Sequence, residues 1–192
     1  MRRSGDFPPI VPKQSYLFCP ANNFDTPMGL TVNPLQNLTL RECRQSDVAA
    51  VRRLIHETID RSYTGVYPPR ALQSFREFHS EENIAERVRT GTVLVLEREG
   101  EIVATGSLVG NEICGVFVRA SCQRCGYGRV VMRELEKRAE ERGVEEVELS
   151  VSLPSRAFYE GLCYEITEEC SMDVGEGQRL DYWRAKKRPG KG

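Results

Sequence analysis

Histidine, tryptophan and long apolar runs are scarce in this sequence. Its 192 residues include two histidines and one tryptophan. No stretch approaches the roughly 18 consecutive apolar residues of a membrane-spanning helix. The start, Met1-Arg2-Arg3-Ser4, leads into Pro8, Pro9 and Pro12 instead of the apolar core of a secretory signal. These absences exclude a protein with spanning helices and predict a soluble protein of the cytoplasm without a membrane partner.

A dominant charge is also lacking. Lysine and arginine total 27, aspartate and glutamate total 28, and the formal net charge is -1. Because no strong positive field surrounds such a chain, the composition argues against a nucleic-acid partner.

The seven cysteines do not follow the paired spacing of a structural zinc site. Cys122-x-x-Cys125 has no second Cys-x-x-Cys or His-x-x-x-His half elsewhere in the chain. We therefore predict no bound metal. An odd number of cysteines, in a chain long enough to bury a core unaided, favours free thiols in a reducing compartment.

Composition divides the chain near residue 37. The first 37 residues hold six of the ten prolines but only five charged residues. Since proline fixes φ and removes a backbone donor, residues 1–37 are predicted to be an extended or disordered segment before one globular domain at residues 38–188. The segment also contains apolar residues, among them Phe7, Ile10 and Phe18. Whether they pack on the domain or on the partner subunit of a homodimer stays open.

Hydrophobic periodicity over residues 38–188 predicts strands and helices. Apolar residues at every second position indicate strands, and apolar residues three and four apart indicate amphipathic helices. Strands are predicted at residues 38–41, 92–98, 101–108, 113–118, 144–152, 166–174 and 178–185. Helices are predicted after Asp47, at 70–89 with Leu72, Phe75, Ile84 and Val88 buried, at 127–142, and near Ser155. Glu99-Gly100 is the predicted turn of a hairpin, and strand 144–152 is predicted to be half-buried with Glu148 and Ser150 outward.

Residues 116–129 form the most informative segment, a strand that passes through a tight turn into a helix. Gly126 and Gly128 lack the Cβ atoms that would hold a ligand away from the backbone. The N-terminus of the helix supplies unpaired N–H groups and about half a positive charge. This turn is therefore able to bind a diphosphate without a lysine, although such turns are also common as plain connections.

The motif Gln123-x-x-Gly126-x-Gly128, after a strand and at the start of a helix, resembles the pyrophosphate loop of the GCN5-related N-acetyltransferase (GNAT) superfamily. Residues 155–164, which contain Phe158-Tyr159-Glu160, are similar to the family's helix after the next strand. The resemblance covers residues 38–187. It implies an α/β (α+β) fold with a mixed, mostly antiparallel central sheet, helices on both faces, and a splay between strands 4 and 5.

The resemblance implies an enzyme that moves an acetyl group from acetyl-CoA to a primary amine by direct attack in a ternary complex. Tyr159 matches the tyrosine that faces the CoA sulfur and is the expected general acid. Glu112 is the expected base, with water or backbone carbonyls as alternatives. CoA is expected to bind at Phe117, Val118, Gln123, Arg124, Cys125, Gly126, Tyr127, Gly128 and Arg129.

The sequence departs from the family pattern at three places. Ala120 stands where a proline is usual, Ser152 where an asparagine is frequent, and Cys163 where the family has a glycine. None of these changes removes backbone donors of the turn, because those donors do not depend on side chains.

The acceptor is not identified by the sequence. Residues 63–69 and 173–178 are the segments expected to select a small-molecule or protein amine. Nearby acidic residues (Glu168, Glu169, Asp173 and Glu176) are able to attract a cationic amine, but charge runs of this kind are usually solvated faces. His56 on the margin of the first helix and His79 in a polar stretch receive no catalytic role. Two other functions stay open, a CoA-sensing domain without turnover and a thiol-disulfide oxidoreductase that uses Cys122 and Cys125.

Overall fold

The computed structural model describes residues 37–190, so nearly all of the segment predicted at residues 1–37 lies outside the described residues. Seven strands form one sheet in the order β1-β2-β3-β4-β5-β7-β6. They are β1 (Leu38–Glu42), β2 (Thr92–Arg98), β3 (Glu101–Val109), β4 (Glu112–Val118), β5 (Val147–Ser152), β6 (Glu165–Asp173) and β7 (Arg179–Lys187). All neighbouring pairs are antiparallel except β4 and β5, which confirms the predicted mixed sheet.

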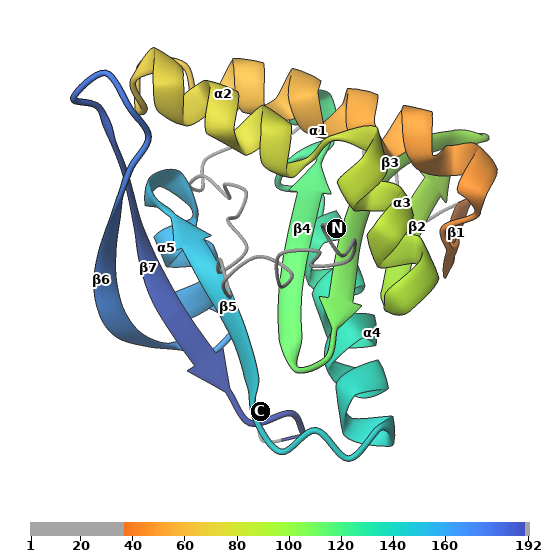
Figure 1. The fold of residues 1–192 in the computed structure, drawn as a ribbon. Coiled ribbons are helices and arrows are strands. Elements are labelled where there is room, and N and C mark those ends of the chain that lie inside the picture. The colour runs from red at the N-terminus through yellow and green to blue at the C-terminus, as the bar shows by residue number, and fades with distance from the viewer. Residues whose placement is uncertain (1–36, 191–192) are drawn as a thin grey trace, which may run out of the picture.

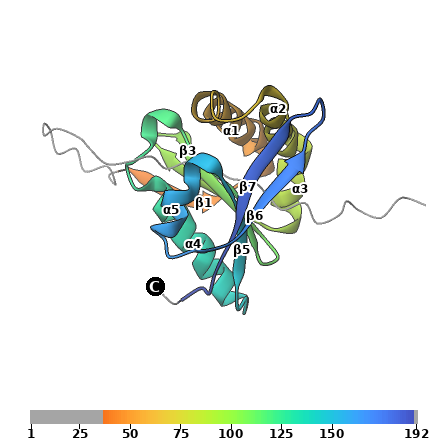
Figure 2. The same cartoon turned by 90° about the vertical axis from the view of Figure 1, so that its left-hand side faces the viewer.

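Helices cover both faces of the sheet (Figures 1 and 2). One side carries α1 (Val48–Ser62), α2 (Pro69–Phe78) and α3 (Glu81–Thr90), and the other carries α4 (Tyr127–Glu141) and α5 (Arg156–Glu160). Short 3-10 turns, η1 (Gln45–Asp47), η2 (Ala120–Cys122) and η3 (Leu153–Ser155), occur before α1, α4 and α5. The apolar stripe of α4, with Val131, Met132 and Leu135, is buried against the sheet. In the described part of the chain, no helix has the length and apolar character needed to cross a membrane.

The predicted hairpin between β2 and β3 is confirmed. Arg98 pairs with Glu101 across a two-residue turn, in which Glu99 has φ 55° and Gly100 has φ 80°. Two left-handed residues in succession give a turn whose twist matches that of the flanking strands.

The single helix predicted at residues 70–89 is wrong, because two helices occupy this range. α2 ends at Phe78, His79 leaves helical geometry with φ -106° and ψ 41°, and α3 begins at Glu81. The Ser80 hydroxyl accepts a hydrogen bond from the Asn83 N–H and so caps α3. On one continuous helix, Phe75 and Ile84 would point about half a turn apart. The break allows both side chains to be buried.

The prediction that β5 is half-buried is also wrong. Glu148 is exposed, but Ser150 and Ser152 on the same face are buried. The Tyr63 hydroxyl, just past the end of α1, donates to Ser152 Oγ at 3.1 Å, and Ser152 Oγ lies 2.7 Å from Ser155 Oγ. Hydrogen bonds of this kind permit the burial of Ser152 on a face that the pattern of apolar and polar residues assigns to solvent. The Oγ of Ser150 is buried without a hydrogen-bond partner among the described residues.

Candidate active site

Strands β4 and β5 diverge soon after they meet. Their parallel pairing is limited to Glu112 with Glu148, and the Glu148 N–H donates to the Asn111 carbonyl oxygen at 3.0 Å. Figure 1 shows the two strands separating toward the arrowhead of β4. The predicted splay between strands 4 and 5 is confirmed. An opened strand edge offers backbone groups to a ligand that carries amides.

Strand β4 contains a bulge along this edge. Two of its residues, Gly115 and Val116, stand opposite the single residue Gly106 of β3. Gly115 has φ 60°, a left-handed conformation that glycine adopts without strain from a Cβ atom. This bulge was not predicted from the sequence, although an isolated glycine within a strand is its usual signal.

The turn between β4 and α4 has an open backbone. Arg124 (φ 64°) and Gly126 (φ 83°) are left-handed, and α4 begins at Tyr127. Gln123 Nε2 donates to the Val118 carbonyl oxygen at 3.2 Å and so ties the turn to the end of β4. A Cβ atom at Gly126 would meet nothing within 4 Å. The space beside this glycine therefore admits a ligand to the main chain, as the diphosphate prediction requires.

Backbone donors gather at the same place. Among residues 37–190, the N–H groups of Arg124, Gly126, Gly128 and Arg129 have no hydrogen-bond acceptor. α4 is 15 residues long, so its aligned peptide dipoles place about half a positive charge at this end. Donors without an acceptor and a partial positive charge together favour an anionic group.

α5 packs against the first turn of α4. A Cβ atom at Gly128 would lie 3.0 Å from the Phe158 ring, so this glycine makes room for α5. Its part in CoA binding stays a prediction. Arg129 Nη1 donates to the Gly161 carbonyl oxygen at 3.3 Å across the same contact. These contacts bring the helix that carries Tyr159 next to the predicted diphosphate turn.

Tyr159 is buried on α5. Its ring centroid lies 4.9 Å from that of Phe158 and 5.7 Å from that of Tyr164, both in edge-to-face contact. Cys163, which replaces the family's glycine, has φ 63°. The residue after α5 is thus left-handed even though it is not a glycine. A side chain in this conformation is strained.

Glu112 lies apart from the other predicted site residues. It begins β4 at the closed end of the divergence, whereas Val118 and the turn follow at the other end of the strand. The extended chain from Glu112 to Val118 spans about 20 Å. The role of the Glu112 carboxylate as a base stays a prediction.

The two histidines lie close to one another. His79 is fully buried although it lies in a polar stretch of the sequence. The break between α2 and α3 directs its ring toward β4, where the ring centroid lies 5.0 Å from that of Phe117. His56 on α1 is half-buried, with Nε2 3.0 Å from the His79 carbonyl oxygen. Burial lowers the pKa of His56, which favours its neutral form.

The cysteines of the described residues are all free thiols, including Cys122 and Cys125. The Cys125 Sγ lies 3.6 Å from the Gln123 carbonyl oxygen, and both thiols are partly exposed beside the turn. Within residues 37–190 no group of three or more His, Cys, Asp or Glu side chains is arranged to hold a metal ion.

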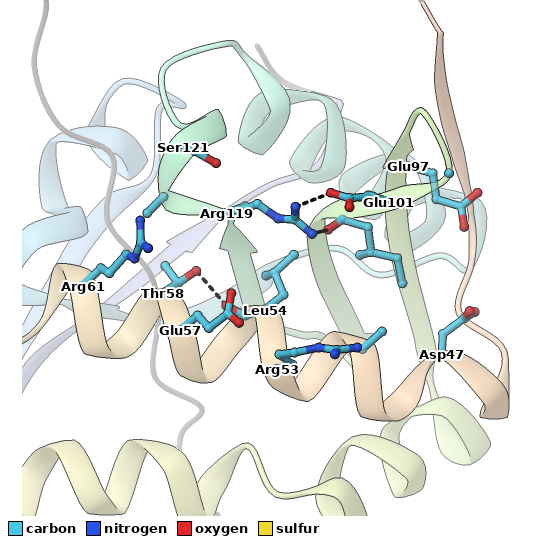
Figure 3. Close-up of a pocket in the computed structure, with 14 residues that line it drawn as sticks. Asp47, Arg53, Leu54, Glu57, Thr58, Arg61, Glu97, Glu101, Arg119 and Ser121 are labelled. Carbon is cyan, nitrogen blue, oxygen red and sulfur yellow. Dashed lines mark hydrogen bonds and ion pairs between the residues drawn. The ribbon is translucent and has the colours of Figure 1, made fainter.

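A cleft of about 530 Å³ lies between α1, the β2–β3 turn and η2 (Figure 3). Its charged lining has both signs, with Arg53, Arg61, Arg119, Asp47, Glu57, Glu97 and Glu101. Arg119 donates to the Glu101 carboxylate and to the Ile102 carbonyl oxygen, as the dashed lines show. None of the predicted site residues lines this cleft. Because three arginines and four carboxylates line it, the cleft favours an anion less than the turn before α4 does.

Comparison with protein families gives a match that covers the turn and both flanking elements. The model of the acetyltransferase (GNAT) family matches residues 52–163, more than half of the chain. The chain belongs to the GNAT acetyltransferase family. The matched range includes β4, α4 and Tyr159.

Solved structures share the fold of this GNAT acetyltransferase. A GCN5-related N-acetyltransferase from Rhodopseudomonas palustris is 20% identical, with a TM-score of 0.73 over 83% of this chain and 99% of the other. PaiA N-acetyltransferase from Thermoplasma acidophilum, solved with coenzyme A, is 16% identical, with a TM-score of 0.65 over 79% and 98%. YncA of Salmonella typhimurium, a proposed acetyltransferase solved with acetyl-CoA, is 17% identical, with a TM-score of 0.59 over 82% and 96%. No curated protein sequence matches the chain.

Proposed function

We propose that residues 38–188 form an N-acetyltransferase domain that moves the acetyl group of acetyl-CoA to a primary amine. The observation that carries this proposal is the set of N–H groups without an acceptor at the start of α4, beside the divergence of β4 and β5. The family match supports acetyl transfer, and the coenzyme A and acetyl-CoA held by two related structures support this choice of donor.

The donor binds along two elements. Its diphosphate accepts hydrogen bonds from the backbone of residues 123–129, where Gly126 leaves the main chain accessible. The amides of its pantetheine arm pair with the free edge of β4 near Phe117 and Val118. This binding mode directs the thioester along β4 toward the bulge at Gly115.

The chemistry is a direct transfer in a ternary complex. The neutral amine attacks the thioester carbonyl carbon, a C–N bond forms, and the C–S bond breaks. The leaving thiolate takes a proton from the Tyr159 hydroxyl, since a phenol is protonated at neutral pH. The extra proton on the amine nitrogen passes to Glu112 through water, or to solvent. The Tyr159 phenolate then regains a proton from solvent, so that the proton count balances.

The acceptor belongs to one of several classes of amine. Two acidic residues near the β6–β7 turn are already engaged, because Glu176 lies 3.7 Å from Arg70 and Asp173 accepts a hydrogen bond from the Gly175 N–H at 2.7 Å. These contacts weaken the argument for a cation-attracting surface. Polyamines, amino acids and protein amines therefore all belong in an acceptor panel.

The test is acetyl-CoA consumption with such a panel, in wild type and in Tyr159→Phe. We expect Tyr159→Phe to lower kcat by about 100-fold, the scale of one general acid, and to leave the Kd for acetyl-CoA unchanged. Tyr164→Phe is the matched control, because Tyr164 is also a buried tyrosine and its hydroxyl donates to Glu136 at 2.9 Å, away from the turn. It is expected to lose stability and keep its kcat.

Two outcomes contradict the transferase. Binding of acetyl-CoA without turnover of any amine favours the CoA-sensing domain. Reduction of insulin disulfides that is lost in Cys125→Ser and indifferent to CoA favours the oxidoreductase.

A further inference from the structure

Arg87 of α3 is a buried cation with no carboxylate partner among the described residues. Its residue is 4% exposed, and none of the ion pairs of residues 37–190 includes it. Nε donates to the Asn83 carbonyl oxygen at 3.0 Å, and Nη2 donates to the Phe78 carbonyl oxygen at 3.2 Å. The guanidinium carbon lies 5.4 Å from the centre of the Phe78 ring. Neutral dipoles and a ring thus hold a charge that is costly to bury without a counterion.

The same guanidinium faces the ring of His79. Nη1 and Nη2 each lie 3.3 Å from His79 Nδ1. An arginine has donors only, so Nδ1 accepts and the ring proton resides on Nε2. The Phe117 ring packs edge-on against this imidazole, at 5.0 Å between centroids. Arg87 therefore determines the tautomer of a ring that contacts β4.

Arg87 also occupies the space left by the missing side chain of Gly115. A Cβ atom at Gly115 would lie 2.9 Å from Arg87 Nη1 and 3.5 Å from His79 Cε1. The guanidinium therefore packs against the bulge of β4 where a side chain at position 115 would stand. Arg87 also lies close enough to affect Cys114 of β4. Burial raises the pKa of the Cys114 thiol to about 11, and the positive charge of Arg87 opposes this rise.

We propose that Arg87 is a positioning residue for acetyl transfer, which holds the bulge of β4 at Gly115 through its contacts with that glycine and with His79. This inference rests on the proposed function, in which the thioester lies along β4. The bulge determines where the free backbone groups of β4 point, and a displacement of the order of 1 Å at reacting atoms can cost about 100-fold in rate. An apolar side chain of similar size would pack at position 87 without the cost of a buried charge. A positioning role gives a reason for the arginine.

The first test reads the tautomer and needs no turnover. The chain has only two histidines, so nitrogen-15 correlation spectra of the imidazoles are simple to assign with His56→Gln as reference. We expect His79 to be a single Nε2–H tautomer in the wild type. In Arg87→Met, the donors to Nδ1 are gone and we expect a mixture of tautomers. A His79 that is Nδ1–H or doubly protonated in the wild type overturns the inference.

The second test separates positioning from stability. We expect Arg87→Met to lower kcat by about 100-fold per folded molecule, with the Kd for acetyl-CoA within about threefold of wild type, because the turn before α4 is untouched. Arg41→Met is the control: Arg41 of β1 donates to Asp47 at 2.6 Å in a partly buried ion pair, and its loss should reduce stability without changing kcat. If Arg87→Met does not fold, Arg87→Lys replaces it, since lysine keeps the charge but lacks the planar fork that reaches three acceptors at once.

The outcomes are distinct from those that test the transferase itself. A wild-type kcat in folded Arg87→Met, or in Arg87→Lys if that variant is used, overturns the positioning role. A wild type that binds acetyl-CoA but acetylates no amine overturns the proposed function, while the tautomer of His79 still reports whether the contact with Arg87 exists.

Discussion

Gly126 combines two properties that no other residue type supplies together. Its φ of 83° is left-handed, and its missing Cβ leaves the backbone before α4 accessible. Gly143, at the other end of α4, has φ 72° and also has no atom within 4 Å of a would-be Cβ. The two glycines therefore carry the same backbone strain in different chemical settings.

Replacing each glycine by alanine separates strain from ligand binding. We expect Gly126→Ala and Gly143→Ala to lose similar stability, about 1 kcal/mol, because both force alanine into the left-handed region. Only Gly126→Ala should weaken acetyl-CoA binding, by about tenfold or more, since its methyl group stands where the diphosphate approaches the main chain. Calorimetric titration and urea unfolding of both variants provide the comparison. Equal acetyl-CoA affinities would remove Gly126 from the site.

The sequence pattern predicted the turn before α4 but not the buried side chains of His79 and Arg87. Gly126 and the start of α4 were predictable because a strand, glycines and an amphipathic stripe follow one another within a short segment. The burial of His79 and the fit of Arg87 against Gly115 were not, because both residues lie among polar neighbours in the sequence. Only the fold brings the Arg87 side chain of α3 next to Gly115 of β4.

At the scale of elements, the break between α2 and α3 determines what faces β4. Ser80 accepts a hydrogen bond from the Asn83 N–H and so fixes the start of α3, and Arg87 follows two turns later. The sequence signal for this break was that Phe75 and Ile84 would point to opposite sides of one continuous helix. An apolar stripe was assumed to continue where the chain instead caps one helix and begins the next.

Removal of this cap should destabilise the protein measurably. We expect Ser80→Ala to lower the free energy of unfolding by about 1 kcal/mol, because an N–H at the start of α3 loses its acceptor. Ser74→Ala is the comparison, since the Ser74 hydroxyl only donates back to the Arg70 carbonyl oxygen inside α2, and its removal should change stability by less than about 0.5 kcal/mol. Urea denaturation distinguishes the two, and equal losses would show that the cap does not define the break.

For the whole molecule, the mixed, mostly antiparallel sheet and the splay followed from the sequence resemblance, and both are confirmed. The faces of β5 did not follow, because hydroxyl groups of Tyr63, Ser152 and Ser155 satisfy one another inside the domain. A pattern of apolar and polar residues carries no information on such hydrogen bonds. The bond between Tyr63 and Ser152 joins segments about 90 positions apart.

Buried thiols make the stability of the whole domain depend on alkaline pH. Burial raises the pKa of Cys114 to about 11 and that of Cys43 to about 11, against about 8.5 in an unfolded chain. Both contributions are fully present below that unfolded value. As the pH rises toward 11, the unfolded chain loses these protons first, so the free energy of unfolding decreases.

Cys114→Ala should reduce this dependence. Between pH 8 and pH 10.5 we expect the loss of stability in the variant to be smaller than in the wild type by on the order of 2 kcal/mol, measured by urea unfolding under reducing conditions. Cys163→Ala, at an exposed position, should follow the wild-type curve. Parallel curves for wild type and Cys114→Ala would contradict the burial of a neutral thiol at this position.

The binding of a diphosphate by main-chain N–H groups before α4 is tested most directly by isothermal titration with coenzyme A and with pantetheine, which lacks the diphosphate and the 3′-phosphoadenosine, in the wild type and in Gly126→Ala, where the added methyl group affects only the diphosphate. Loss of several charge-assisted hydrogen bonds predicts an affinity for pantetheine at least about 100-fold weaker than for coenzyme A. Equal affinities, or no heat with coenzyme A, would contradict the account.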